Sequence, residues 1–345
     1  MADKLFNTAE EQRMFLESAD AQTIMEALGN PPEPNKELKD LMSPMYQMIA
    51  DENELRWFFE HVIEKPQVNE SYSMVFVSRH KKLSKEEQKT IGLTRKESEF
   101  LATQTLRLGK FKDALYIDEE TNWTFENFLK RVKRFNVDKY AYTTALGAPI
   151  PTKTLAIIFY VNPCDDIKVC REFFTQYLDV NQSIAKAMLS GKTTVDNLQS
   201  YQWYGNAENN IKHLKANCKG SRYWTDYDLD VPSWWKDDPA MVEAMKTRIQ
   251  KFYKKGEYII VTTSGGYHIL VKNSAIHFDP HGLCKDLTQH YEYLVSQCGK
   301  QRYVDENGVE KFECIVNDSQ IPGIPLPGTY QYNRPVTILN KEDFE

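Results

Sequence analysis

Acidic residues alternate with aromatic and aliphatic ones in the stretch YWTDYDLDVP, residues 223–232. Asp226, Asp228 and Asp230 stand at every second position, and side chains at that spacing share one face of a β-strand. Carboxylates held this close repel one another unless a cation lies between them. Mg²⁺ and Mn²⁺ bind carboxylate oxygens together with substrate phosphates. The stretch predicts a metal site or, more simply, an edge strand with an acidic exterior.

Two later segments contain groups that a metal and phosphate site needs. TTSGGYHILV places Ser264 and Gly266 just before His268. Glycines let a backbone approach a ligand closely, and the turn amides with the Ser264 hydroxyl can face phosphate oxygens. The alternative for this segment is a Gly-Gly hairpin turn with a packed histidine. A predicted strand ends at Asp318 in the segment FECIVNDSQ, and a Pro/Gly-rich loop leads on to Arg334.

In this order the segments resemble the three motifs of the archaeo-eukaryotic primase superfamily, the primase-polymerases. The matching pieces are YDLDVP, SGGYH and IVND, and the resemblance covers roughly residues 137–345. It implies a two-metal nucleotidyl transferase with an RNA-recognition-like (RRM-like) sheet and bound Mg²⁺ or Mn²⁺. Two ions of this kind can clamp the attacking and leaving oxygens of phosphoryl transfer.

The resemblance also implies a role for each matching residue. Asp228, Asp230 and Asp318 correspond to the catalytic carboxylates that bind metal. The residues that correspond to the triphosphate-binding groups are Ser264, Gly266, His268 and Arg334. Asp226 departs from the pattern, because the family usually has an apolar residue there. Asp226 is a third metal ligand, an acid that contacts the ligands but not the metal, or the solvated end of the row.

The activity so implied is that of a DNA primase-polymerase, which joins NTPs or dNTPs on a single-stranded DNA template during replication. Three alternatives remain open: a primer-dependent gap-filling polymerase, a non-catalytic nucleic-acid-binding module, and a metal-dependent nuclease. A replicative helicase is an expected partner, in trans or on a C-terminal part absent from this chain.

Composition and charge limit the class of protein and its expected location. The 345 residues carry a net charge of −6 and a pI of about 5.8, which argues against a passive nucleic-acid coat protein. Basic runs at residues 79–85, 129–135 and 246–258 are solvated faces or phosphate contacts. No apolar stretch is long enough for a membrane span and the N-terminus is not a signal peptide, so we expect a cytoplasmic protein, in the host cytoplasm if viral or plasmid-encoded.

The six cysteines form no CxxC pair, which favours reduced thiols over a disulfide scaffold. His277, Asp279, His281 and Cys284 lie close together in the sequence, but their spacing is more typical of a loop than of a zinc site.

Hydrophobic patterns predict an α+β fold with an RRM-like mixed or antiparallel catalytic sheet and flanking helices. Strands are expected at 72–77, 139–148, 154–163 and 223–232, and hairpins at 257–272 and 301–318. Helices are expected at 165–189, 238–256 and 284–299. Residues 1–136 form a mainly helical accessory region in this prediction, and residues 137–345 form the catalytic domain.

Overall fold

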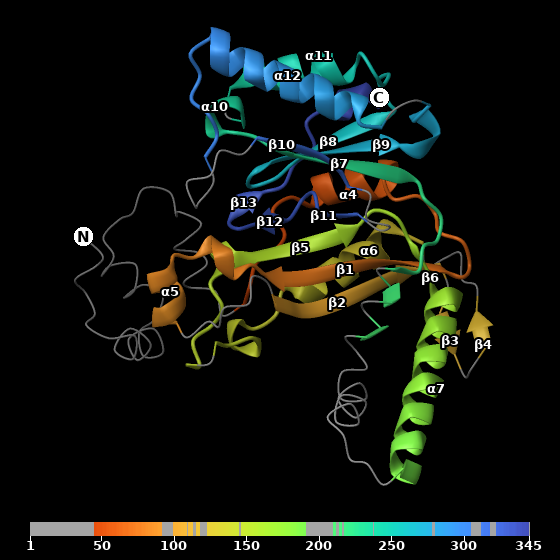
Figure 1. Cartoon of the computed structure of the whole chain (residues 1–345). Coiled ribbons are helices and arrows are strands. Elements are labelled where there is room, and N and C mark those ends of the chain that lie inside the picture. Colours follow the sequence, from red (N-terminus) through yellow and green to blue (C-terminus); the bar gives the residue numbers. More distant parts are fainter. Residues whose placement is uncertain are drawn as a thin grey trace.

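In the residues that it describes, a computed structural model contains two larger antiparallel sheets with helices packed against them, and two further sheets of two strands each (Figure 1). It describes residues 45–91, 99–108, 110–112, 115–117, 123–144, 146–190, 210–211, 214–215, 217–236, 238–277, 280–304, 312–317 and 322–344. The predictions that fall elsewhere, namely the first part of the mainly helical region, Asp279, the middle of the 301–318 hairpin and Asp318, lie outside these residues. The α+β class is confirmed.

The first sheet has the strand order β11-β5-β1-β2, and β6 also pairs with β1. Its strands are β1 (Glu70–Ser78), β2 (Glu99–Arg107), β5 (Leu155–Tyr160), β6 (Cys164–Asp165) and β11 (Gly323–Pro325). One face carries Tyr72, Met74 and Phe76, which pack in the main hydrophobic core. Helices α4 (Glu52–His61) and α6 (Phe125–Val132) contribute to the same core.

The second sheet has the order β10-β7-β9-β8. Its strands are β7 (Trp224–Asp230), β8 (Tyr258–Thr262), β9 (Gly266–Lys272) and β10 (Glu313–Asn317). The face with Tyr227, Leu229 and Ile269 packs in a separate core under helices α11 (Pro239–Ile249) and α12 (Gly282–Gln297). Figure 1 shows these helices above the sheet, so the other face of β7 is directed toward the first sheet.

The remaining elements join or extend these layers. Helix α7 (Asp166–Ser190) projects away from both sheets (Figure 1). The shorter elements are α5 (Lys85–Thr90), β3 (Lys110–Lys112), β4 (Leu115–Ile117), α10 (Ser233–Lys236), β12 (Tyr330–Gln331) and β13 (Arg334–Pro335).

The β12–β13 hairpin connects the two sheets. The amide of Tyr332 donates to the carbonyl of Leu155 on β5 at 2.9 Å. The neighbouring Gln331 side chain accepts from the amide of Ser264, in the β8–β9 turn, at 2.6 Å. Tyr332 and Asn333 adopt positive φ angles of 52° and 66°, which suit a two-residue hairpin turn. The hairpin therefore fixes the β8–β9 turn relative to the first sheet.

Several predicted elements are confirmed, among them β1, β5, β7, the β8–β9 hairpin, α7 and α12. The strand predicted at residues 139–148 is wrong. The segment begins with a 3₁₀ turn capped by Asp138 and closes a turn through the bond from the Gly147 amide to the Thr144 carbonyl. Gly147 has a φ of +78°, a conformation that a regular strand excludes.

The region expected to be mainly helical, residues 1–136, contains β1 and β2, and β1 pairs with β5 across the predicted boundary. The pairing of distant strands requires tertiary contacts, which local periodicity does not encode. The division into two domains itself stays a prediction.

Candidate active site

The acidic row, defined as Asp226, Asp228 and Asp230, lies on one face of β7, but its members have different surroundings. Asp226 is fully buried, the side chain of Asp228 is 50% exposed, and Asp230 is partly exposed. Asp226 is therefore closed off from solvent, and Asp228 is the most exposed of the three. Only the last two carboxylates can meet a ligand from solvent.

His268 on β9 stands beside the acidic row, because the strand register pairs it with Asp228. Its Nδ1 donates to the two carboxylate oxygens of Asp226 at 2.9 and 3.1 Å. Its Nε2 faces Asp228, with 3.9 Å to Oδ1. Asn317 on β10 donates its side-chain amide to Asp226 at 3.2 Å. The carboxylate of Asp226 is therefore engaged by two protein donors.

The electrostatics of this group favour a protonated imidazole. Burial lowers the pKa of His268, but the carboxylates of Asp226, Asp228 and Asp230 outweigh burial and raise it to about 8. Burial also raises the pKa of Asp228; His268 lowers it, whereas Asp226 and Asp230 raise it further. A cation placed beside Asp228 would oppose the rise in its pKa that Asp226 and Asp230 cause.

Arg79 is a site residue that sequence reasoning did not single out from its basic run. It follows β1 at the end of the first sheet, and its charge lowers the pKa of Asp228 on the second sheet. Burial raises the pKa of Tyr332 in the connecting hairpin, and the charge of Arg79 opposes this rise. A run of basic residues in the sequence does not show which of their charges acts on a carboxylate of another sheet.

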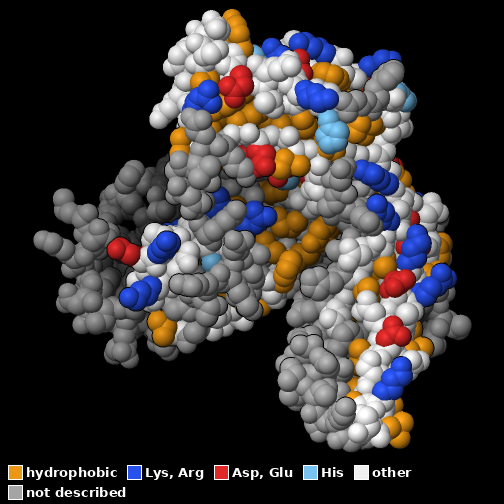
Figure 2. All heavy atoms as spheres, in the orientation of Figure 1, with side chains coloured by type: hydrophobic (Ala, Val, Ile, Leu, Met, Phe, Trp, Pro, Cys, Tyr) orange, Lys and Arg blue, Asp and Glu red, His pale blue; other side chains and the backbone are white. Residues whose placement is uncertain are grey.

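The space between the sheets is hollowed. Figure 2 shows carboxylates at the upper edge of this inter-sheet cleft, apolar side chains along its floor and Lys or Arg side chains beside it. The face of the first sheet opposite the main core carries a buried cluster of Val75, Val77, Ala156 and Tyr332, with Ile158 and Tyr160 packed against it. The cleft thus combines an acidic edge, a cation and an apolar surface.

The β8–β9 turn is built differently from a free phosphate cradle. The amides of Gly265 and Gly266 donate to the Thr263 hydroxyl, at 3.3 and 2.9 Å, and the Ser264 amide donates to Gln331. A Cβ on Gly266 would lie 1.9 Å from the Leu229 carbonyl oxygen, so the close approach of β7 and β9 requires glycine here. A Cβ on Gly265 would lie 3.0 Å from an oxygen of Asp230. The turn therefore supports Asp230 and leaves the partly exposed Ser264 hydroxyl as a contact for a ligand.

The other predicted site residues are less closely connected. Arg334 is exposed on β13, paired in register with the Gln331 that holds the Ser264 amide. Asp318 lies outside the described residues, directly after Asn317 of β10. Within the described residues, no three His, Cys, Asp or Glu side chains form a group that could hold a metal ion. The metal ligands predicted from the sequence thus include one residue whose position is undescribed.

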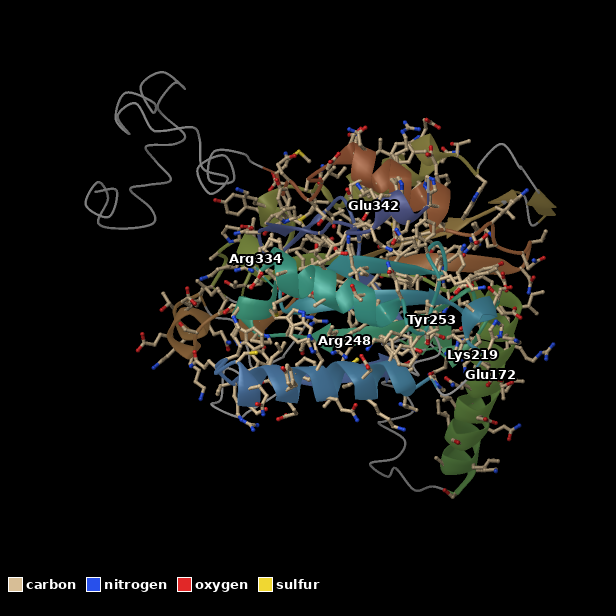
Figure 3. All side chains as sticks on the ribbon, turned by 90° about the horizontal axis from the view of Figure 1, so that it is seen from above. Glu172, Lys219, Arg248, Tyr253, Arg334 and Glu342 are labelled. Atoms are coloured by element: carbon tan, nitrogen blue, oxygen red, sulfur yellow. The ribbon has the colours of Figure 1, made fainter. Side chains whose placement is uncertain are left out.

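The third basic run lies away from the acidic row. Arg248 of α11 pairs with Asp286 of α12 at 2.7 Å, and Lys251 approaches the same carboxylate at 3.5 Å. Lys255 pairs with Asp343 at 2.9 Å. Figure 3 looks down on these helices, which cover the opposite face of the second sheet, and places Arg248 between them. These cations are paired with acids, as on a solvated helix face.

The comparisons with known proteins contradict the resemblance to the primase superfamily. The family model described as "Antitoxin TacA 1-like" matches residues 7–47, and no primase or polymerase family matches. This match covers a small part of the 345 residues, nearly all of it outside the described residues, so it does not assign the chain to that family. No curated protein and no solved structure matches the chain.

The resemblance was wrong as evidence of kinship because each of its motifs is only a few residues long. Alternating acids on a strand and a glycine turn before a histidine satisfy local rules that any antiparallel sheet can meet.

No described helix is long and apolar enough to cross a membrane.

Proposed function

We propose that the protein is a metal-dependent nucleotidyl transferase that builds a nucleic-acid strand on a single-stranded DNA template from NTPs or dNTPs. The observation that carries the proposal is the pairing of two solvent-reaching carboxylates, Asp228 and Asp230, with a buried, carboxylate-held His268. The proposal includes the expected RRM-like character of the second sheet. It rests on this geometry and on no family relationship.

The carboxylates fit a hard divalent cation. Asp228 and Asp230 present oxygen ligands at the open end of β7, whereas the oxygens of Asp226 are engaged by His268 and Asn317. When bound there, Mg²⁺ or Mn²⁺ would neutralise phosphate charge and activate an attacking hydroxyl. Asp318, next in the chain after Asn317, is the proposed third carboxylate. Asp226 then acts on His268 and is not a metal ligand.

The nearby cations suit a triphosphate. A protonated His268 directs its Nε2 proton toward Asp228. Arg79 adds a second positive charge that acts on Asp228. Charge-assisted hydrogen bonds of this kind are the strong ones for phosphate oxygens. Ser264 and Arg334 are the proposed outer contacts, at the β8–β9 turn and the hairpin beside it. Such groups position the reacting phosphate, and positioning with electrostatics provides most of the catalysis in phosphoryl transfer.

The test is incubation of the full chain with single-stranded DNA, labelled nucleotides and Mg²⁺ or Mn²⁺, with and without a primer. Products formed without a primer support a primase-polymerase, and products formed only with a primer support a gap-filling polymerase. Bound DNA with neither synthesis nor cleavage overturns the catalytic proposal and leaves a binding module.

Variants connect the activity to the site. Asp228→Ala and Asp318→Ala are each expected to reduce incorporation at least about 100-fold, because a positioned electrostatic group typically supplies that much. The matched control is Asp179→Ala, which removes an exposed carboxylate from the projecting helix α7. Full activity in either site variant, with the fold intact, contradicts the assignment.

A metal-dependent nuclease is the second candidate, because the same carboxylates serve hydrolysis. The observation in its favour is that the amides of the β8–β9 turn are already bonded within the protein and are not free to cradle a triphosphate. The same assay separates the two reactions, since a nuclease shortens the labelled DNA and leaves the nucleotides unused.

A further inference from the structure

Two cysteines from different elements meet between the second sheet and helix α12. Cys284 lies in the first turn of α12, and Cys314 lies on β10. Their Sγ atoms are 3.0 Å apart, with the Cys314 thiol donating to the Cys284 sulfur. Neither is in a disulfide. The contact therefore joins a covering helix to the edge strand next to β7.

The sheet register explains why these side chains meet. Cys314 pairs with Leu229 of β7, so it points to the helix-covered face and away from the acidic row. Cys284 is buried in the same core, where Leu283 and Leu287 also pack. Packing of α12 and alternation along β10 thus hold the two sulfurs together independently of any ligand.

We propose that Cys284 and Cys314 form a reversible disulfide that fastens α12 to β10. A disulfide brings its sulfurs to about 2.05 Å, so they need to approach by roughly 1 Å from their present separation. Side-chain rotation and a small helix shift provide movements of this size. The remaining four cysteines are placed differently: Cys164 contacts Ser71 and Asp166, Cys218 is buried in a separate cluster, and Cys170 and Cys298 are exposed.

The chemistry is thiol–disulfide exchange with a small-molecule disulfide as the oxidant. The thiolate of Cys314, the more exposed of the two, attacks one sulfur of the oxidant and releases one small thiolate. The thiolate of Cys284 then attacks the mixed disulfide at the Cys314 sulfur and releases the second small thiolate. Two protein thiols are oxidised by two electrons, and one external disulfide is reduced to two thiols.

Oxidation would restrain β10, the strand that lies next to β7 and contacts the acidic row. β10 is an edge strand of the second sheet, and its Asn317 donates to Asp226. Edge strands open more readily than central ones, so a covalent link to α12 slows the opening of β10. The oxidised protein is therefore expected to melt several degrees higher and to exchange the β10 amide protons more slowly.

The experiment treats the full chain with oxidised glutathione at mildly alkaline pH, alkylates the remaining thiols and digests with trypsin. The expected product joins the tryptic peptides 273–285 and 312–341, at about 2 Da below the summed mass of the two reduced peptides. Dithiothreitol should separate the peptides and return the melting temperature to its original value.

Serine variants are the controls. Cys284→Ser and Cys314→Ser should each abolish the link, whereas the double variant Cys170→Ser/Cys298→Ser, which removes the exposed thiols, should keep it. Recovery of both peptides as alkylated species, as glutathione adducts only, or joined to another cysteine overturns the proposal. The readout is a peptide mass, so its outcome is independent of the proposed nucleotidyl transfer.

Discussion

At the scale of single residues, Asp226 is the acid whose role differs most from that of its neighbours. It is buried, accepts from His268 and Asn317, and its charge favours the protonated imidazole. Asp228, only two positions along the strand, is half exposed. The same residue type therefore holds a histidine at one position and is open to a ligand at the next.

Replacing Asp226 by asparagine should lower the pKa of His268 below its value of about 8, because the neutral amide no longer stabilises the imidazolium. The measurement is an NMR titration of the His268 ring protons in the presence of a chelator. The control is the same titration of the wild-type protein under identical conditions. An unaltered His268 titration would show that Asp226 does not set its charge.

Gly266 is expected to tolerate no side chain. Alanine there would bring Cβ to 1.9 Å from the Leu229 carbonyl oxygen, which forces β7 and β9 apart. Such overpacking should lower the free energy of unfolding by about 3 kcal/mol or more, as measured by urea denaturation. Gly265→Ala is the matched control, since its Cβ meets only a carboxylate oxygen of Asp230 at 3.0 Å. Equal stability of the two variants would contradict this account.

At the scale of elements, α4 is central because it packs in the main core and holds the C-terminal segment. Its buried Glu54 accepts from the amide of Ile338 at 2.7 Å and from Lys341. Ile338 in turn forms an isolated bridge with Val261 of β8. Helix α4 thus connects the first sheet's core to the edge of the second sheet.

Asp51 caps α4 through its carboxylate, which accepts from the amides of Asn53 and Glu54 at 2.8 and 3.4 Å. Replacing it by alanine leaves these amides unsatisfied and should cost about 1 kcal/mol of stability. Chemical denaturation measures the loss, and Asp51→Ser, which retains a capping oxygen, should recover most of it. A serine variant as unstable as the alanine variant would mean that capping is not the cause.

At the scale of the whole molecule, stability should depend on pH through His268. Its pKa in the folded protein, about 8, exceeds the ordinary value of 6.5, so folding favours the protonated form. This contribution is fully present below pH 6.5 and is lost as the pH rises through about 8. Its upper limit is about 2 kcal/mol, since one pKa unit corresponds to about 1.4 kcal/mol.

The check is urea denaturation of the metal-free protein at several pH values across this range, beside His268→Gln. The wild-type free energy of unfolding should fall with rising pH, and the variant should lack that component. Parallel pH profiles for the two proteins would assign the dependence to other groups.

The sequence by itself determined those features that depend on near neighbours in the chain. Alternation predicted that Asp226, Asp228 and Asp230 share a face, and turn chemistry predicted the β8–β9 hairpin at Ser264 to Gly266. Helical periodicity predicted α7 and α12. These features follow from local backbone geometry, which a short stretch of residues encodes.

Only the tertiary structure decided what each acid does. The register of β7 with β9 and β10 brings His268 and Asn317 to Asp226. The charge of Arg79, which follows β1 of the first sheet, lowers the pKa of Asp228. The same register turns Cys314 toward Cys284. These partners are distant in sequence, so their contacts depend on strand pairing and burial. Burial separates a carboxylate that accepts from a histidine from one that is exposed to solvent on the same strand.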